Sequence, residues 1–174
     1  LRPEELRQKI AMVPQQVNLF SGSIRENLLM AAPEADDRTL LAALEEAGLG
    51  KFVRSLEKGL DSEVGNAGSA LSGGQRQKMG IARALLSKAE YLIFDEATSS
   101  VDPESEREIW KTIGELAHTR TLIIISHRMS SVKNADCISL HMPYIPENHH
   151  LFNAETFKKM KPTAYFVNCA RGKI

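Results

Sequence analysis

Two short stretches of this sequence combine residue types that could handle a phosphate group. The first, LSGGQ at residues 71–75, places Ser72 and two glycines where a helix is predicted to begin. A helix N-terminus exposes unpaired N–H groups and the positive end of the helix dipole, and Gly73 and Gly74 have no Cβ to keep an anion from the backbone. Ser72 and Gln75 also form a capping box, so an ordinary capped helix with a flexible entry stays open as the alternative.

The second stretch, YLIFDE at residues 91–96, ends an apolar run with two adjacent acids. Open α/β sheets place their chemistry at the carboxyl ends of buried strands. Asp95 could hold Mg²⁺ there, directly or through water, and Glu96 could orient or deprotonate an attacking water. A strand that ends in two solvated acids is the alternative, and the pair alone does not decide between them.

Two further polar residues directly follow apolar runs. His127 comes after TLIIIS, where an imidazole could contact a γ-phosphate or the water that attacks it. Gln15 lies in the loop after IAMV, where its amide could contact a metal ion or a water. Taken singly, each of them also fits an ordinary surface residue.

These side chains need strands and helices that bring them together. Apolar runs predict strands at 10–13, 91–94 and 121–125, the last apolar on both faces as central parallel strands are. Capping residues and helical spacing predict helices that begin near Ser23, Asp37, Lys51, Ser72 and Asp102. Strands alternating with helices predict an α/β fold, a three-layer domain with a parallel sheet and a small helical lobe.

Composition restricts the functions that this chain could have. Its 174 residues carry 22 basic and 22 acidic side chains, so no excess charge draws it to nucleic acid or anionic lipid. Its apolar runs are too short to cross a bilayer, no secretory signal precedes them, and two cysteines make no disulfide framework. We therefore expect a cytoplasmic domain that binds no nucleic acid and does not insert into a membrane. The start at Leu1 without methionine suggests a piece of a longer polypeptide.

The order of VPQQ, LSGGQRQ, YLIFDEATSSVD and IIISHR resembles the nucleotide-binding domain of ATP-binding-cassette (ABC) transporters. The resemblance covers residues 1 to about 136, and LFSGSIRENL and SEVGNAGSALSGGQ look like the exporter branch. Asn66 departs from it, since exporters usually carry Glu in this loop.

The resemblance implies roles for the residues singled out above. It makes Gln15 the Q-loop glutamine, in contact with Mg²⁺ and the attacking water, Asp95 the magnesium carboxylate, Glu96 the catalytic base and His127 the switch histidine. Residues Ser72, Gly73, Gly74 and Gln75 become the signature motif, and Ser100 to Asp102 the D-loop, both of which contact nucleotide. It further implies Mg²⁺ with ATP as cofactor, and a second nucleotide-binding domain and a transmembrane domain as partners.

The phosphate-binding loop that such a site needs is missing from the sequence. A P-loop requires G-x-x-x-x-G-K-[ST], whose backbone amides and lysine hold the phosphates. The only Gly-Lys pairs, at 50–51 and 172–173, are followed by Phe52 and Ile174. In the family the P-loop and a stacking aromatic lie ahead of the Q-loop, so we expect that a chain beginning at Leu1 has lost them. Little or no ATPase activity is expected of this chain alone.

After Asp136 the ABC pattern ends and a second resemblance begins. Residues 135 to 174, with SLHMP, HLFN, MKP and NCARG in order, are similar to the cofactor domain of NAD-dependent D-2-hydroxyacid dehydrogenases. That resemblance implies that Arg171 corresponds to the arginine that binds the substrate carboxylate. No G-x-G-x-x-G precedes it, so the site for the dinucleotide pyrophosphate is missing.

Two resemblances in one chain predict a chimera of a P-loop-NTPase-like and a Rossmann-like piece. We place the join near residues 135–137, with an ABC portion at 1–136 and a dehydrogenase-like strand, loop, helix and strand at 137–174. From topology we expect strand 137–141 to complete the sheet in the place of the lost P-loop strand. Three readings follow: a partial exporter-type ABC ATPase domain, an engineered or recombined scaffold without activity, and a dehydrogenase fragment that binds NAD.

Overall fold

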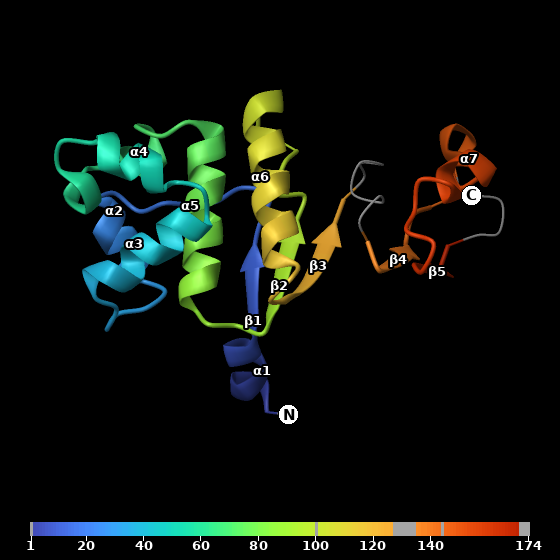
Figure 1. The fold of residues 1–174 in the computed structure, drawn as a ribbon, viewed down its shortest axis with the longest axis horizontal. Coiled ribbons are helices and arrows are strands. Elements are labelled where there is room, and N and C mark those ends of the chain that lie inside the picture. The colour runs from blue at the N-terminus through green and yellow to red at the C-terminus, as the bar shows by residue number, and fades with distance from the viewer. Residues whose placement is uncertain (1, 100, 127–134, 144, 171–174) are drawn as a thin grey trace. The chain divides into compact units, whose positions relative to one another are not determined.

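The computed structural model describes residues 2–99, 101–126, 135–143 and 145–170. The chain divides into two compact units, Leu1–Ile125 and Ser126–Ile174 (Figure 1). The first unit contains the longer helices and a three-stranded sheet, and the second contains a two-stranded sheet. None of the helices in the described ranges has the length and apolar character needed to span a membrane.

The sheet of the first unit is parallel, as predicted. Its strands β1 (Ile10–Val13), β2 (Tyr91–Asp95) and β3 (Thr121–Ile125) lie in the order β1-β2-β3. The helix α1 (Pro3–Lys9), which the apolar pattern did not predict, directly precedes β1. Because all three strands run in the same direction, the loops that follow them emerge at the same edge of the sheet. The α/β fold class is therefore confirmed.

One face of this sheet packs on two long helices, α5 (Gly73–Leu86) and α6 (Pro103–Leu116). Figure 1 shows α6 in front of the strands and α5 beside β1. Val13, Leu92 and Phe94 on that face are at most 1% exposed and belong to the same core as both helices. Successive side chains along each strand point alternately to this face and to the opposite face. There Met12, Ile123 and Ile125 are 47–52% exposed.

The side chains of β3 are more exposed than predicted. Its isoleucines at 123–125 are 38–49% exposed, so the prediction of a central strand buried on both faces is wrong. A parallel strand is buried on both faces only where helices cover both and strands lie on both sides. In the described part of the chain, β3 pairs only with β2 and stands at the edge of its sheet.

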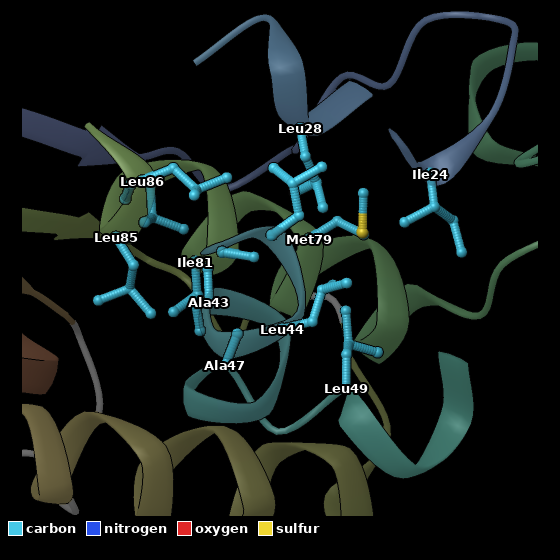
Figure 2. Packing of buried hydrophobic residues seen from close by; sticks show 14 of the residues in the cluster. Ile24, Leu28, Ala43, Leu44, Ala47, Leu49, Met79, Ile81, Leu85 and Leu86 are labelled. Atoms are coloured by element: carbon cyan, nitrogen blue, oxygen red, sulfur yellow. The ribbon is translucent and has the colours of Figure 1, made fainter. Parts of the chain in front are cut away.

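The predicted helical lobe is present between β1 and α5. It comprises α2 (Ile24–Leu29), α3 (Asp37–Glu46) and α4 (Gly50–Ser55), followed by the short turns η1 (Gly59–Asp61) and η2 (Asn66–Gly68). Ser23 caps α2 as expected, with its hydroxyl accepting a hydrogen bond from Glu26 N at 3.1 Å. Figure 2 shows how the lobe packs on α5, through apolar side chains at Ile24, Leu28, Ala43, Leu44, Ala47, Leu49, Met79 and Ile81.

The second unit is a small parallel pair with a connection that crosses over it. β4 (Cys137–Leu140) pairs with β5 (Tyr165–Asn168), and η4 (Pro146–Asn148) and α7 (Ala154–Phe157) lie between them in the chain. Phe152, Phe157 and Phe166 form an aromatic cluster with ring centroids 4.7–5.9 Å apart. Asn153 caps α7, and the helix ends at Phe157. Met160 N bonds to Phe157 O, a tighter turn than the α-helix makes.

The expectation that strand 137–141 completes the larger sheet stays a prediction. β4 pairs with β5 in a sheet of their own, and no described strand of the first unit joins them. β4 and β5 are joined by residues 141–164 and are neighbouring strands along the chain. Pairing of strands close in sequence costs less loop-closure entropy than pairing with a distant strand.

Candidate functional site

The residues predicted to act on nucleotide lie partly on the loops that follow β1 and β2. Gln15 Nε2 donates a hydrogen bond to Ser99 Oγ at 3.0 Å, which ties the loop after β1 to the loop after β2. Asp95 ends β2 opposite Ile125. The next residue, Glu96, has φ of 47° and donates its N–H to Ile125 O at 2.9 Å. A positive φ is uncommon for a side-chain-bearing residue, and here it turns the chain out of the strand at the second of the two acids.

Two residues that sequence reasoning missed hold Gln15 in place. Ser99 receives the hydrogen bond from Gln15, and Gln77 on α5, only 4% exposed, donates from Nε2 to Pro14 O at 3.0 Å. Both partners are more than 60 residues away from the loop that they hold. Adjacency to LSGGQ and DEATS was the only available signal for either residue.

A half-buried arginine on α5 fixes the continuation of the same loop. Arg83 Nη1 donates to Asn18 O at 2.7 Å, and its Nε donates to Asn27 O at 2.8 Å. The Asn27 side chain, which is buried, bonds in turn to both backbone groups of Phe20. Burial lowers the pKa of Arg83 below its ordinary value, but a guanidinium stays charged at neutral pH. The loop after β1 is therefore anchored to α5 at several points.

The start of α5 has the cap that its sequence predicts. Ser72 Oγ accepts from Gln75 N at 3.2 Å, and Gln75 Oε1 accepts from Ser72 N at 2.9 Å. Gly74 is buried, and a Cβ built on it would lie 2.3 Å from Ser105 Oγ of α6. Gly74 thus has a packing reason to be glycine in addition to any approach by an anion. Ser72 itself is exposed and open to a ligand.

Asp102 lies at the N-terminus of α6, which approaches the start of α5 through the contact between Ser105 and Gly74. Its Oδ1 accepts from Ser105 N at 2.9 Å and from Glu104 N at 3.1 Å. The hydrogen bond from the Ser105 backbone is the main reason why the pKa of Asp102 lies below its ordinary value. The structure therefore brings two groups of predicted residues together: Gln15 with the loop carrying Asp95 and Glu96, and the starts of α5 and α6. Ser100, His127 and Arg171 lie outside the described residues.

The donor set at the end of β2 suits a hard cation that is shared with a phosphate. Carboxylate, carboxamide and hydroxyl oxygens are available from Asp95, Gln15 and Ser99, and Mg²⁺ prefers oxygen ligands. Within the described ranges, no group of three or more His, Cys, Asp or Glu side chains could hold a metal ion.

Comparison with known proteins gives two family matches along the chain. The sequence model of the family "ABC transporter" matches residues 2–99. The model "D-isomer specific 2-hydroxyacid dehydrogenase, NAD binding domain" matches residues 115–174. The chain is also similar to a solved structure described as a bacterial Atm1-family ABC exporter with ATP bound, with a TM-score of 0.68 and 37% identity, covering 76% of this chain and 23% of that one.

Several curated relatives are described as ATP-dependent lipid A-core flippases. The protein of Colwellia psychrerythraea is 43% identical over 135 residues, which is 78% of this chain and 22% of that protein. The protein of Haemophilus influenzae is 46% identical over 136 residues, and that of Idiomarina loihiensis is 48% identical over 132 residues. The chain thus spans between 22% and 23% of the length of these three relatives.

Proposed function

The chain belongs to the ABC transporter family, and we propose that residues 1–136 are part of the ATPase domain of an exporter. In this proposal the chain contributes to two different ATP sites of a parent dimer. The loops after β1 and β2 supply Mg²⁺ and water contacts to one site, and the start of α5 supplies phosphate contacts to the other. The coupled activity, ATP hydrolysis that drives export, belongs to the intact parent on the cytoplasmic side of a membrane.

The observation that carries this proposal is the hydrogen bond from Gln15 to Ser99. It holds a carboxamide beside the loop that begins with Asp95 and Glu96, although 84 residues separate the two partners. Gln15 and Asp95 would hold the magnesium ion, which when bound would neutralise charge on the transferring phosphate. Glu96 would accept a proton from the attacking water, and Gln15 would orient that water. His127 would contact the γ-phosphate.

The start of α5 supports the phosphate-binding half of the proposal. Its N-terminal N–H groups and dipole favour an anion, and Ser72 adds an exposed hydroxyl at the same place. In this proposal Gly73, Gly74 and Gln75 complete the contact, and Ser100 and Asp102 also contact the nucleotide. Of these last two, Asp102 is the N-cap of α6. Because the sequence has no G-x-x-x-x-G-K-[ST], this half needs ATP held by the P-loop of a second nucleotide-binding domain.

A complementation experiment tests this proposal. The full chain is added to an ABC ATPase subunit that has an intact P-loop and a disabled signature motif, and phosphate release is measured. We expect release to rise with the concentration of this chain, because its α5 supplies the missing contacts. The chain alone should release little or no phosphate.

Two variants make the experiment specific for the start of α5. Asp caps a helix about as well as Ser, so Ser72→Asp should keep the fold while placing a negative charge against the phosphate. Asn153→Asp makes the matched neutral-to-acidic change at the N-cap of α7, where Asn153 accepts from Glu155 N and Thr156 N. Ser72→Asp should abolish the stimulation and Asn153→Asp should retain it. Stimulation that survives Ser72→Asp, or no stimulation by the wild-type chain, would refute the proposal.

A second candidate function rests on the dehydrogenase family match to residues 115–174. In that hypothesis the second unit is a fragment of an NAD-binding domain, and Arg171 would bind a substrate carboxylate. Titration of NADH with the full chain tests this hypothesis, and binding should enhance the NADH fluorescence. If Arg171→Ala keeps that enhancement, cofactor binding does not depend on the residue expected to bind the carboxylate. A flat titration together with a cooperative melt, and no complementation, would leave a folded scaffold without activity.

A further inference from the structure

Three polar side chains that neither proposed function uses meet on one face of the β4–β5 pair. Ser139 Oγ lies 2.8 Å from His141 Nε2 and 3.8 Å from Cys169 Sγ. Ser139 is opposite Val167 in the parallel register, and His141 and Cys169 each follow two residues later, directly after the ends of β4 and β5. The bond from Cys169 N to Leu140 O, 3.1 Å, continues the ladder to this point. The neighbourhood of the three groups is therefore fixed by backbone pairing.

The Ser139 hydroxyl can connect the other two groups. A hydroxyl both donates and accepts, so it can take a proton from the Cys169 thiol while giving its own to an imidazole nitrogen. The Nε2 atom of His141 can receive that proton when the neutral ring carries its hydrogen on Nδ1. Cys169, Ser139 and His141 thus have the order of donor, relay and base.

We propose that Cys169 is a nucleophilic thiol, with His141 acting as its base through Ser139, and that it forms thioethers with small α,β-unsaturated carbonyl compounds. As the S–C bond forms, the thiol proton passes to Ser139 Oγ and the hydroxyl proton passes to His141 Nε2. The C=C electron pair moves to the carbonyl as an enolate, which takes the proton back from the imidazolium through the relay. The product is the adduct with a neutral imidazole, and no other reactant is consumed. All three residues are exposed, so a dissolved electrophile can reach them.

The chain contains its own reference thiol. Cys137 is also free and exposed, and it lies on β4 two residues before Ser139. In the described part of the chain, its thiol has no hydrogen-bond partner, whereas the thiol of Cys169 has Ser139. Any difference in reactivity between two exposed thiols of one small sheet then reports on the relay and not on access.

The test uses N-ethylmaleimide, an α,β-unsaturated carbonyl, on the full chain at neutral pH. Alkylation of Cys137 and Cys169 is followed separately by peptide mass spectrometry after quenching at short times. General-base assistance contributes about 10²-fold or more in enclosed sites, and for these exposed groups we expect Cys169 to react roughly tenfold faster than Cys137.

Variants of the relay decide the outcome. Ser139→Ala and His141→Gln should each lower the rate at Cys169 to that at Cys137, while Cys137 keeps its own rate. Ser139→Thr keeps the hydroxyl and should restore fast alkylation, which separates loss of the relay from loss of the fold. Equal rates at the two cysteines in the wild-type chain would overturn the proposal. So would a Cys169 rate that Ser139→Ala leaves unchanged, or that Ser139→Thr fails to restore.

Discussion

The Asp102 carboxylate accepts hydrogen bonds from two N–H groups at the start of α6, and the bond from Ser105 is the main cause of its lowered pKa. Asp36 has a lowered pKa chiefly because the Thr39 hydroxyl donates to it, at 2.6 Å. Asp61 has a lowered pKa chiefly because Arg25 donates to it. In each case the charged carboxylate is the form that the fold favours.

This sets the direction in which acid acts on stability. A carboxyl group whose folded pKa lies below its unfolded value, about 3.9 for Asp, contributes stability above that value and loses it as pH falls through the folded pKa. We therefore expect the free energy of unfolding, measured by urea denaturation, to fall from pH 5 to pH 2. Asp102→Asn keeps the cap without a titrating group, and its loss over the same range should be smaller. An equal loss in wild type and variant would contradict the role given to Asp102.

Local contacts were predictable at this scale and distant ones were not. The capping boxes at Ser23 and Ser72 join residues three positions apart, so residue types and spacing were sufficient to predict them. The bond from Gln15 to Ser99 joins residues 84 positions apart. Such a contact depends on how the strands align, and no pattern along the sequence encodes that alignment.

At the scale of elements, the positions of strands and helices followed from the sequence, but their surroundings did not. The run at residues 121–125 is a strand as predicted, and its isoleucines look the same whether a second layer covers them or not. The run at 137–141 is also a strand, but its partner is β5. A run of apolar residues indicates that a segment is a strand. The order of strands in a sheet depends instead on which strand edges compete to pair with it.

Two glycines inside helices should respond oppositely to the same substitution. A Cβ on Gly80 of α5 would lie 2.5 Å from Val17 Cγ2, and Val17 is a stiff β-branched side chain in the loop after β1. A Cβ on Gly114 of α6 would meet nothing within 4 Å. Gly80→Ala should destabilise the chain by about 1–3 kcal/mol through overpacking. Gly114→Ala should stabilise it by about 0.5–1 kcal/mol through helix propensity.

Urea denaturation of both variants measures the two changes under the same conditions. Gly114→Ala serves as the matched control, since the chemical change is identical and only the surroundings differ. If Gly80→Ala were as stable as the wild-type chain, Val17 in the loop after β1 would not be held firmly against α5.

At the scale of the whole molecule, the two units differ greatly in how many apolar side chains each buries. Of the buried apolar side chains among the described residues, all except Leu140 belong to the first unit. The second unit relies on Leu140 and its aromatic cluster, and a segment of this size is marginal without a larger core. The join predicted near residues 135–137 stays a prediction, because the units divide after Ile125 and the dehydrogenase match begins at residue 115.

We expect the two units to unfold separately. The only tryptophan, Trp110, lies on α6 in the first unit, so its fluorescence reports on that unit alone. Phe166→Ala removes the ring that contacts both Phe152 and Phe157, and it should abolish the dispersed amide resonances of the second unit. The urea midpoint of Trp110 fluorescence should stay unchanged.

Ile109→Ala is the converse control, because Ile109 is fully buried in the core of the first unit. A buried Ile→Ala change costs about 2–5 kcal/mol and should shift the Trp110 midpoint strongly. A shift of that midpoint in Phe166→Ala would show that the two units unfold as one.

Among the residues that the structure describes, β3 has a free edge, and this edge bears on how the protein behaves at high concentration. Residues 121–125, TLIII, carry no charge and no proline, and β-branched residues predominate. Such a segment at a free sheet edge is a template on which other chains can add strands, and its end state is an insoluble cross-β aggregate. Warming a concentrated solution should therefore produce thioflavin-positive fibres, with a lag that Ile123→Lys lengthens by placing a charge on the strand. The three isoleucines that help to form a folded sheet would then also limit the protein's shelf life.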